Sequence, residues 1–385
     1  MMASDYLDHN ATTPLDARVL ADMQPYLQGA VGNPSSIHRY GRQVRSAIDK
    51  ARQQLALLLG VNVAQVVFTS GGTEANNLAL KGVAGTFSPG HIIIGATEHS
   101  SVVQSALALE RQGWRLDWLG VDDNGRTCSE LLMSLLCDDT RLVSLMMANN
   151  ETGVITDIAA ISAAMQGQAA VLHCDAVQAL GKVAVDFAAS GAGLMSLSGH
   201  KINGPAGIGA LIIDRSIELQ PLLHGGGQEA GLRSGTENVA AIVGFGRAAE
   251  LALAERSVRY EQMLALRQRL EQRLQTELPG LVVFAREAER LPNTVFFAVP
   301  GMAGETLVMA LDDDGFAVAS GSACSSSNNA PSHVLMAMGV DDELARCAVR
   351  VSLGPENDVE TVDRFVDSLK QQVHKLTTNR AALAW

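Results

Sequence analysis

One lysine of this chain lies in a setting that suits nucleophilic chemistry. Lys201 follows the apolar run 194–197 and the polar pair Ser198 and His200, and a glycine–proline turn comes after it. A confined amine with a lowered pKa is what a Schiff base with a carbonyl group requires, and Ser198 and His200 could hold a phosphate nearby. A structural lysine that caps backbone carbonyls is the alternative, and this segment alone favours neither. We expect the other five lysines on or beside helices or near strand starts, where solvent exposure is natural: Lys50, Lys81, Lys182, Lys370 and Lys375.

A carboxylate ends another apolar run. Asp175 follows residues 171–174, so we expect its side chain to be buried or nearly so and to need a partner. A protonated pyridine nitrogen would serve, because an acid paired with that nitrogen makes pyridoxal phosphate an electron sink. The alternative is a helix N-cap. The alternation of side chains along a strand turns Cys174 to the opposite side, where we expect it to pack.

A glycine-rich turn is the candidate phosphate site. Residues 68–74 read as a strand that runs through Gly71 and Gly72 into Thr73 and a helix. Glycines let backbone amides approach an anion, and the first turn of a helix favours negative charge. An ordinary turn with Thr73 as N-cap remains the alternative.

Three further residues could bind a cofactor or substrate or transfer protons. His99 follows a strand and could stack on an aromatic cofactor and transfer protons near neutral pH, although a structural histidine is the commoner case. Asn150 precedes a glycine turn and could reach a ring hydroxyl or a substrate carboxylate, or serve only the turn. Arg350 interrupts an apolar strand, which suggests bidentate carboxylate binding or an edge position facing solvent.

A cysteine in a polar loop is the candidate nucleophile. Cys324 is flanked by serines, alanine and glycine, so it cannot belong to a core, and exposure is typical of reactive thiols. An inert surface cysteine is the alternative. The five cysteines include no C-x-x-C pair, which argues against a disulfide framework and a structural zinc site.

Composition narrows the class of protein. With 385 residues, 47% of them hydrophobic, the chain can form large cores and about two domains. The net charge of -12 argues against direct nucleic-acid binding. The N-terminus lacks the features of a signal peptide, and no apolar stretch is long enough to span a membrane, so we expect a cytoplasmic protein without membrane contact.

Short apolar runs alternate with helical patterns up to about residue 236, which predicts an α/β domain with a covered, parallel or mixed sheet. One long helical stretch follows over 237–278, with a gentle break expected near Glu255. The remainder mixes strands and helices. We therefore predict a large domain over 15–256, and a small α+β domain over 257–385 that includes the segment 1–14 and carries the Cys324 loop.

The order of these motifs resembles the cysteine desulfurases of the aminotransferase class V group, of the nitrogen-fixation and iron–sulfur-cluster types. The resemblance covers essentially the whole chain, through the segments 7–14, 32–36, 72–74, 97–99, 149–153, 175–178, 198–201, 233–238, 320–324 and 350–353. It implies an aminotransferase-like, pyridoxal-phosphate-dependent transferase fold of fold type I. In that fold a large α/β domain with a mostly parallel seven-stranded sheet is joined to a smaller α+β C-terminal domain.

The resemblance also implies residue roles. Lys201 would bind the cofactor covalently, Asp175 would pair with its ring nitrogen, and His99 would stack on the ring. Gln178 would contact the ring oxygen, and the phosphate would be held by Gly72, Thr73, Ser198, His200 and, from a neighbouring subunit, Thr236. Asn150 and Arg350 would bind the substrate carboxylate.

The implied reaction moves sulfur from L-cysteine to Cys324. Lys201 would remove the α-proton, with His99 assisting, and the Cys324 thiolate would attack the substrate sulfur to give a persulfide and alanine. Related aminotransferases or selenocysteine lyases share the cofactor residues; Cys324 argues against the former, and a non-catalytic scaffold is the alternative outside this class. One departure is Ala230, where the family commonly has arginine.

The resemblance implies partners as well. We expect L-cysteine as substrate, a homodimer, and an acidic or scaffold-type protein that accepts the sulfur for iron–sulfur cluster assembly or another thiolation pathway. No metal site is expected, although Cys324 could transiently ligate an iron–sulfur cluster.

Overall fold

The predicted apolar runs form a seven-stranded sheet. The computed structural model describes residues 5–29, 31–321 and 330–383. The strand order is β2-β8-β7-β6-β5-β3-β4, and β8 alone runs antiparallel to the other six strands. The prediction of a mostly parallel sheet of seven strands is confirmed. Its strands are β2 (Val66–Thr69), β3 (His91–Gly95), β4 (Arg115–Leu119), β5 (Thr140–Met146), β6 (Val171–Asp175), β7 (Leu194–Ser198) and β8 (Gly209–Ile213).

Helices cover both faces of this sheet, which is why most of its strands are apolar on both sides. Ile92 and Ile94 pack against α3 (Gly72–Ala84) and α4 (Ser100–Glu110). Ile93 points the other way, into a core shared with α2 (Arg39–Leu59). The same core takes Cys174, which is fully buried, as the alternation of side chains predicted.

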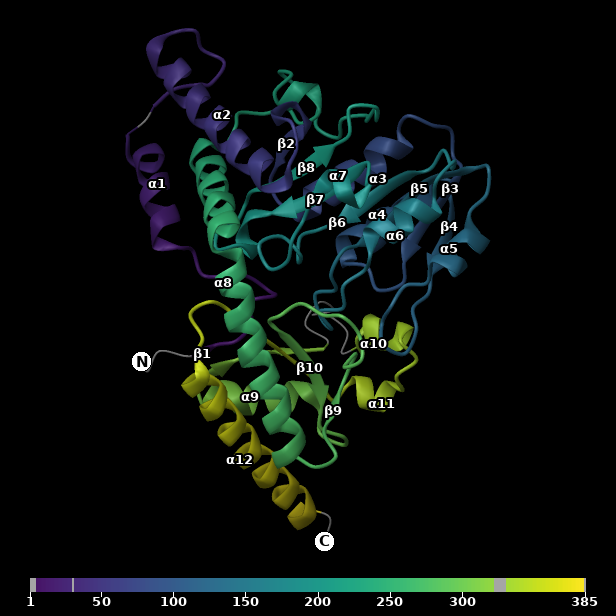
Figure 1. Cartoon of the computed structure of the whole chain (residues 1–385), viewed down its shortest axis with the longest axis vertical. Coiled ribbons are helices and arrows are strands. Elements are labelled where there is room, and N and C mark those ends of the chain that lie inside the picture. Colours follow the sequence, from purple (N-terminus) through teal and green to yellow (C-terminus); the bar gives the residue numbers. More distant parts are fainter. Residues whose placement is uncertain (1–4, 30, 322–329, 384–385) are drawn as a thin grey trace.

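A second, antiparallel sheet lies below the first in Figure 1, with strand order β12-β13-β10-β9. Its apolar face packs against α9 (Gly304–Asp313), α12 (Val359–Leu383) and the C-terminal half of α8 (Val239–Glu277). The N-terminal strand β1 (Asp5–Tyr6) pairs with β11 (Phe316–Ala317) beside it. The sheet is built from β9 (Val282–Val283), β10 (Thr294–Ala298), β12 (Ala319–Ser320) and β13 (Ala348–Ser352).

Helix α8 joins the two sheets as one element. It runs through 39 residues from Val239 to Glu277, past both sheets (Figure 1). The break expected near Glu255 is absent, so no interruption of the helix marks the predicted domain boundary. The division into 15–256 and 257–385 stays a proposal.

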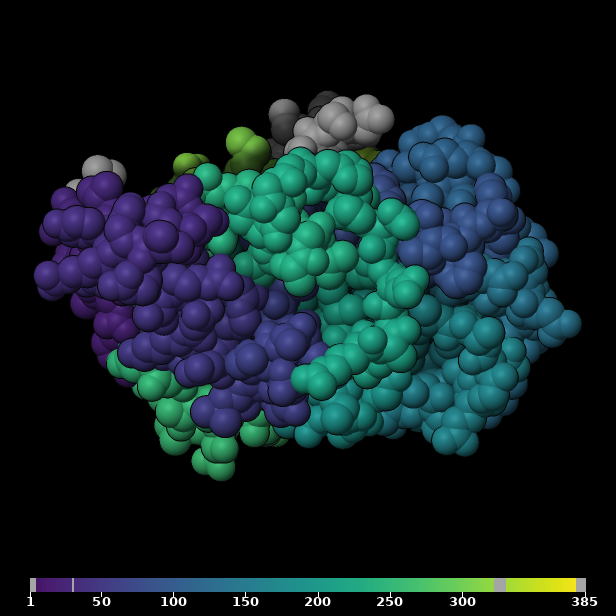
Figure 2. All heavy atoms as spheres, turned by 90° about the horizontal axis from the view of Figure 1, so that it is seen from above, coloured from purple at the N-terminus to yellow at the C-terminus, as the bar shows by residue number. Residues whose placement is uncertain are grey.

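The remaining helices are short or peripheral. Helices α1 and α2 lie at one end of the face seen from above, and the segment 214–238 crosses its middle (Figure 2). Among the described residues, no helix combines the length and apolar composition that crossing a bilayer requires. The helices not yet given are α1 (Ala17–Gln28), α5 (Ser129–Leu135), α6 (Ile158–Ala164), α7 (Phe187–Ser190), α10 (His333–Ala337), α11 (Asp342–Ala345) and the 3-10 turns η1 (Val63–Gln65), η2 (Gly199–Lys201) and η3 (Glu229–Gly231).

The C-terminal half of α8 should be a main source of stability for the smaller sheet. Leu270 has no exposed surface and packs in the core of that sheet. We expect Leu270→Ala to lower the free energy of unfolding by about 2–5 kcal/mol, because it leaves a cavity. The measurement is urea unfolding. The control is Val258→Ala on the same helix. Val258 is 71% exposed, so this change should alter the free energy of unfolding by less than about 0.5 kcal/mol.

Candidate active site

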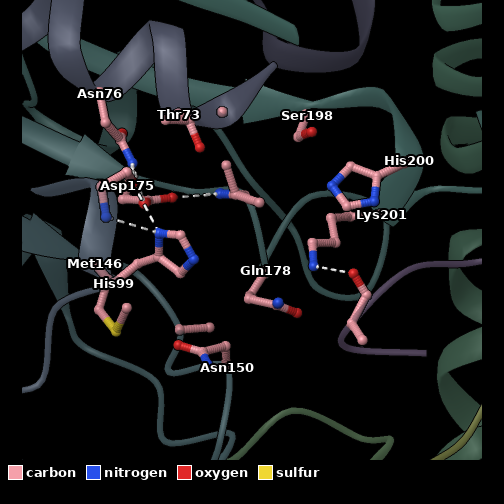
Figure 3. A pocket seen from close by; sticks show the side chains of 15 residues that line it. Thr73, Asn76, His99, Met146, Asn150, Asp175, Gln178, Ser198, His200 and Lys201 are labelled. Atoms are coloured by element: carbon pink, nitrogen blue, oxygen red, sulfur yellow. Dashed lines mark hydrogen bonds between the residues drawn. The ribbon is translucent and has the colours of Figure 1, made fainter. Parts of the chain in front are cut away.

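A cavity of about 290 Å³ lies where strands of the large sheet end. Its wall includes the last residues of β5, β6 and β7 and the first residues of α3. Ligands of open α/β sheets bind at this edge because the carboxyl ends of parallel strands meet there. The lining residues, shown in Figure 3, are Ala11, Gly72, Thr73, Asn76, His99, Ser101, Met146, Ala148, Asn150, Asp175, Val177, Gln178, Ser198, His200 and Lys201.

The Asp175 carboxylate is held in place by two donors. Its Oδ2 accepts from Asn76 Nδ2 at 2.7 Å, and its Oδ1 accepts from the Val177 amide at 3.0 Å (Figure 3). The residue is only 5% exposed. A fixed, desolvated carboxylate in a cavity wall is suited to binding a cationic ring nitrogen.

His99 caps α4 and presents a neutral ring to the cavity. Its Nδ1 accepts the Ser101 amide at 3.1 Å, so the proton of the neutral imidazole is on Nε2. Burial lowers the pKa of His99; Asp175 opposes this shift, while Lys201 and His333 add to it. The neutral form is therefore favoured at pH 7.

The Lys201 amine lies in the cavity and caps carbonyls at the same time. Its Nζ donates to the backbone oxygens of Asn10 at 2.5 Å and Ala11 at 2.7 Å. The sequence left open whether Lys201 serves carbonyl chemistry or caps backbone carbonyls. Its position in the structure is compatible with both. Burial lowers the pKa of His200 to about 4, and the positive charge of Lys201 contributes to this lowering.

The first turn of α3 is open to an anion. No side chain caps this helix at Gly71, so Thr73 is not the N-cap. A Cβ on Gly72 would lie 2.8 Å from the Val177 side chain, so only glycine fits there. Together with the Thr73 and Ser198 hydroxyls, the free backbone amides can hold a phosphate.

Arg350 lies beside the cavity rather than in its lining. Its Nη1 donates to the Asn150 carbonyl at 3.0 Å, and its Nη2 contacts Asp8 Oδ1 at 2.6 Å. Strand β13 is paired on both sides and Arg350 is 5% exposed, so the alternative of a solvent-facing edge arginine is wrong.

One further predicted residue lies apart from this cavity, and another lies outside the described residues. Thr236 is exposed and does not line the cavity. Ala230 is exposed, with φ of 57°, in η3. Cys324 lies in the segment 322–329, which the structure does not describe. The other predicted cofactor residues, including Gln178 and Asn150, line the cavity.

Sequence reasoning missed three polar residues here. Asn76 and Asn10 are each 1% exposed, and no strand end or glycine turn marks either as special. Lys182 was expected at the surface, and that expectation is wrong: it is 6% exposed and bonded to side chains beside the cavity. For Asn76, the one available signal is its position one turn after Thr73 on α3.

Comparison with known proteins agrees with this geometry. A family model described as aminotransferase class-V matches residues 5–365. The cysteine desulfurase IscS of Dictyoglomus turgidum is 41% identical over 375 residues, which cover 97% of this chain and 95% of that protein. The structure of a NifS-like protein aligns at 36% identity with a TM-score of 0.91, over 96% of this chain and 99% of its own. The structure of SspA in complex with cysteine aligns at 32% identity with a TM-score of 0.81, over 92% of this chain and 100% of its own.

These matches and the mostly parallel sheet define a fold type I transferase, as predicted. The chain belongs to the aminotransferase class-V family and, within it, to the cysteine desulfurases. The predicted class of enzyme is confirmed.

A buried histidine next to Asp175 should make stability depend on pH. Burial lowers the pKa of His173 to about 4, against about 6.5 in the unfolded chain. Below pH 6.5 the unfolded chain therefore binds a proton that the folded chain does not, and stability falls until the pH reaches the folded pKa. We expect this residue to account for a loss of about 2 kcal/mol between pH 7 and pH 5.

Urea unfolding at both pH values checks this expectation. The loss should be smaller by about 2 kcal/mol in His173→Gln, whereas the exposed His374→Gln should behave as the wild type. An equal pH dependence in all three proteins would contradict the assignment.

Proposed function

We propose that this desulfurase binds pyridoxal 5'-phosphate in the cavity around Lys201 and transfers the sulfur of L-cysteine to Cys324, leaving L-alanine. The observation that carries the proposal is the meeting of Lys201, His99 and Asp175 in one cavity at the strand ends. The similar protein SspA was solved with cysteine, which supports cysteine as the substrate.

The residues of the cavity fit this cofactor from three sides. Asp175 offers a buried carboxylate to the pyridine nitrogen, the first turn of α3 suits the phosphate, and Lys201 offers an amine to the aldehyde. His99, which lines the same cavity, would lie against the ring. The bound cofactor supplies an electron sink for the electron pair left on the substrate's α-carbon.

Lys201 and His99 handle the protons. Lys201 would hold the cofactor through its Nζ, and the same amine is placed to remove the proton from the substrate's α-carbon. His99 carries its proton on Nε2 and donates from there during cleavage. Asn150 and Arg350, which touch each other, orient the substrate carboxylate.

Cys324 completes the reaction as the sulfur acceptor. Its thiolate attacks the substrate sulfur, an S–S bond forms, and the C–S bond breaks with its electron pair going to the β-carbon. The carbon fragment then takes up one proton at the β-carbon and regains one at the α-carbon, which gives alanine. Both sides of the Cys324 segment are anchored beside the cavity, which supports this role. Ala319 pairs with Arg350 in the sheet, and Ser332 donates to Glu151, the neighbour of Asn150.

The proposal extends to partners and location. The exposed Thr236 reaches the phosphate in a second copy of the chain, which makes the functional unit a homodimer. The persulfide passes to an acidic or scaffold-type acceptor protein, for iron–sulfur cluster assembly or another thiolation pathway. We place this reaction in the cytoplasm, where thiols stay reduced; the four described cysteines are all free.

The first test is an assay of alanine and sulfide from L-cysteine in the presence of a thiol reductant. We expect equal amounts of both products from the wild type. Cys324→Ser should keep the visible absorbance of the lysine-bound cofactor but lose roughly a hundredfold or more in both products, because the nucleophile is gone. Lys201→Ala should lose both the absorbance and the turnover.

The matched control is Cys128→Ser, which changes an exposed free cysteine and should leave both readings unchanged. Wild-type rates from Cys324→Ser would refute the persulfide role. A wild type without any cofactor absorbance, even after pyridoxal phosphate is added, would refute the cofactor and favour a non-catalytic scaffold.

A further inference from the structure

Lys182 is a buried lysine that the proposed reaction does not use. Its Nζ donates to two amide oxygens, Asn10 Oδ1 at 2.7 Å and Gln178 Oε1 at 2.8 Å. The residue is 6% exposed, and burial lowers the pKa of its amine well below the usual range, with further lowering from Lys201 and Arg350. A buried lysine costs stability unless its donors are used. The two hydrogen bonds meet that need, but they do not explain why a lysine is buried at this position.

The two bonds fix which way the Gln178 amide faces. An amide offers an oxygen that accepts and a nitrogen that donates, and either end could turn towards a cavity. Lys182 supplies donors to Oε1, so the oxygen faces Lys182 and the nitrogen faces away from it. Nε2 then donates to the Asn10 carbonyl at 2.9 Å. Its second N–H is left for the cavity that Gln178 lines.

Gln178 and Lys201 share an acceptor. Both donate to the same backbone oxygen of Asn10, at 2.9 and 2.5 Å, so their nitrogen atoms are neighbours. In pyridoxal phosphate the ring carbon next to the aldehyde-bearing carbon holds a phenolic oxygen. A cofactor joined to Lys201 through its aldehyde would have that oxygen within reach of the Gln178 amide.

We propose that Lys182 is a positioning residue, which holds the Gln178 amide so that it can only donate to the phenolic oxygen of the cofactor. This inference rests on the proposed function, since it requires the cofactor on Lys201. Donation to a phenolate favours its ionised form. Lys182 thus tunes the acidity of the lysine-bound cofactor without touching it.

Other charges face the same position and must be separated from this effect. His9, Lys201 and Arg350 all interact electrostatically with Lys182, and Arg350 is itself paired with Asp8. Removing a lysine could therefore shift a nearby titration through its charge alone. Only an effect that depends on Gln178 identifies positioning.

The test is a double-mutant cycle on the pH midpoint of the visible absorbance of the lysine-bound cofactor. The proteins are the wild type, Lys182→Met, Gln178→Ala and the double variant, all loaded with pyridoxal phosphate. We expect Lys182→Met to raise the midpoint by about one pH unit, as the loss of a hydrogen bond to a charged oxygen would. In the Gln178→Ala background the same change should have little further effect.

Two variants accompany the cycle. Lys370→Met makes the same substitution at a surface lysine paired with Glu277 and should leave the midpoint unchanged. Lys182→Gln keeps an N–H donor at a similar place and should give a smaller shift than Lys182→Met. It also provides the measurement if Lys182→Met does not fold.

The outcomes separate the two proposals. A wild type that shows the cofactor absorbance establishes cofactor binding before any variant is compared. With that established, equal shifts in both backgrounds would mean that Lys182 acts by charge, and no shift would mean that it is only structural. Either result would overturn the positioning role while leaving the proposed function intact.

Discussion

The site depends on one buried asparagine. Asn10 is 1% exposed and bonds to segments that flank both sheets: its Oδ1 accepts from Lys182 and Asn293, and its backbone oxygen accepts from Lys201 and Gln178. A buried amide that satisfies all its hydrogen-bonding groups specifies one arrangement, because any shift leaves a polar atom unpaired. The segment that carries Asn10 therefore sets where the Lys201 amine lies. Its remaining partners are Asn150, Thr294 and Ser352.

The charge balance of the cavity depends on burial. Glu98 is fully buried and close to Asp175, and burial, with that neighbouring charge, raises the pKa of Glu98 well above its usual range. This shift favours the neutral form of Glu98 and so works against a second negative charge beside Asp175. The pKa values of His99 and His200, which line the cavity, are lowered, again mainly by burial. The cavity thus keeps its histidines neutral at pH 7.

The sequence allowed the sheet and most of the site to be predicted for a physical reason. Strands covered on both faces read as apolar runs, and residues such as Asp175 and Lys201 stand out because a polar group directly follows such a run. Lys182 and Asn10 carry no such mark. They are buried by a contact across 172 residues of sequence, which no local pattern encodes. The prediction of a break in α8 was wrong for a related reason. Both halves of the helix contribute residues to hydrophobic cores, and this packing outweighs a local polar stretch.

The same long-range contacts have a consequence for how the protein is made. Asn10 is translated long before Ser352, yet its amide donates to the Ser352 hydroxyl, 342 positions later. The strand β1 likewise has to wait for β11. During synthesis the large sheet can form first, but the wall around Lys201 closes only when the last sheet strand has been translated. A ligand of this cavity can therefore find its complete binding site only after β13 has been synthesised.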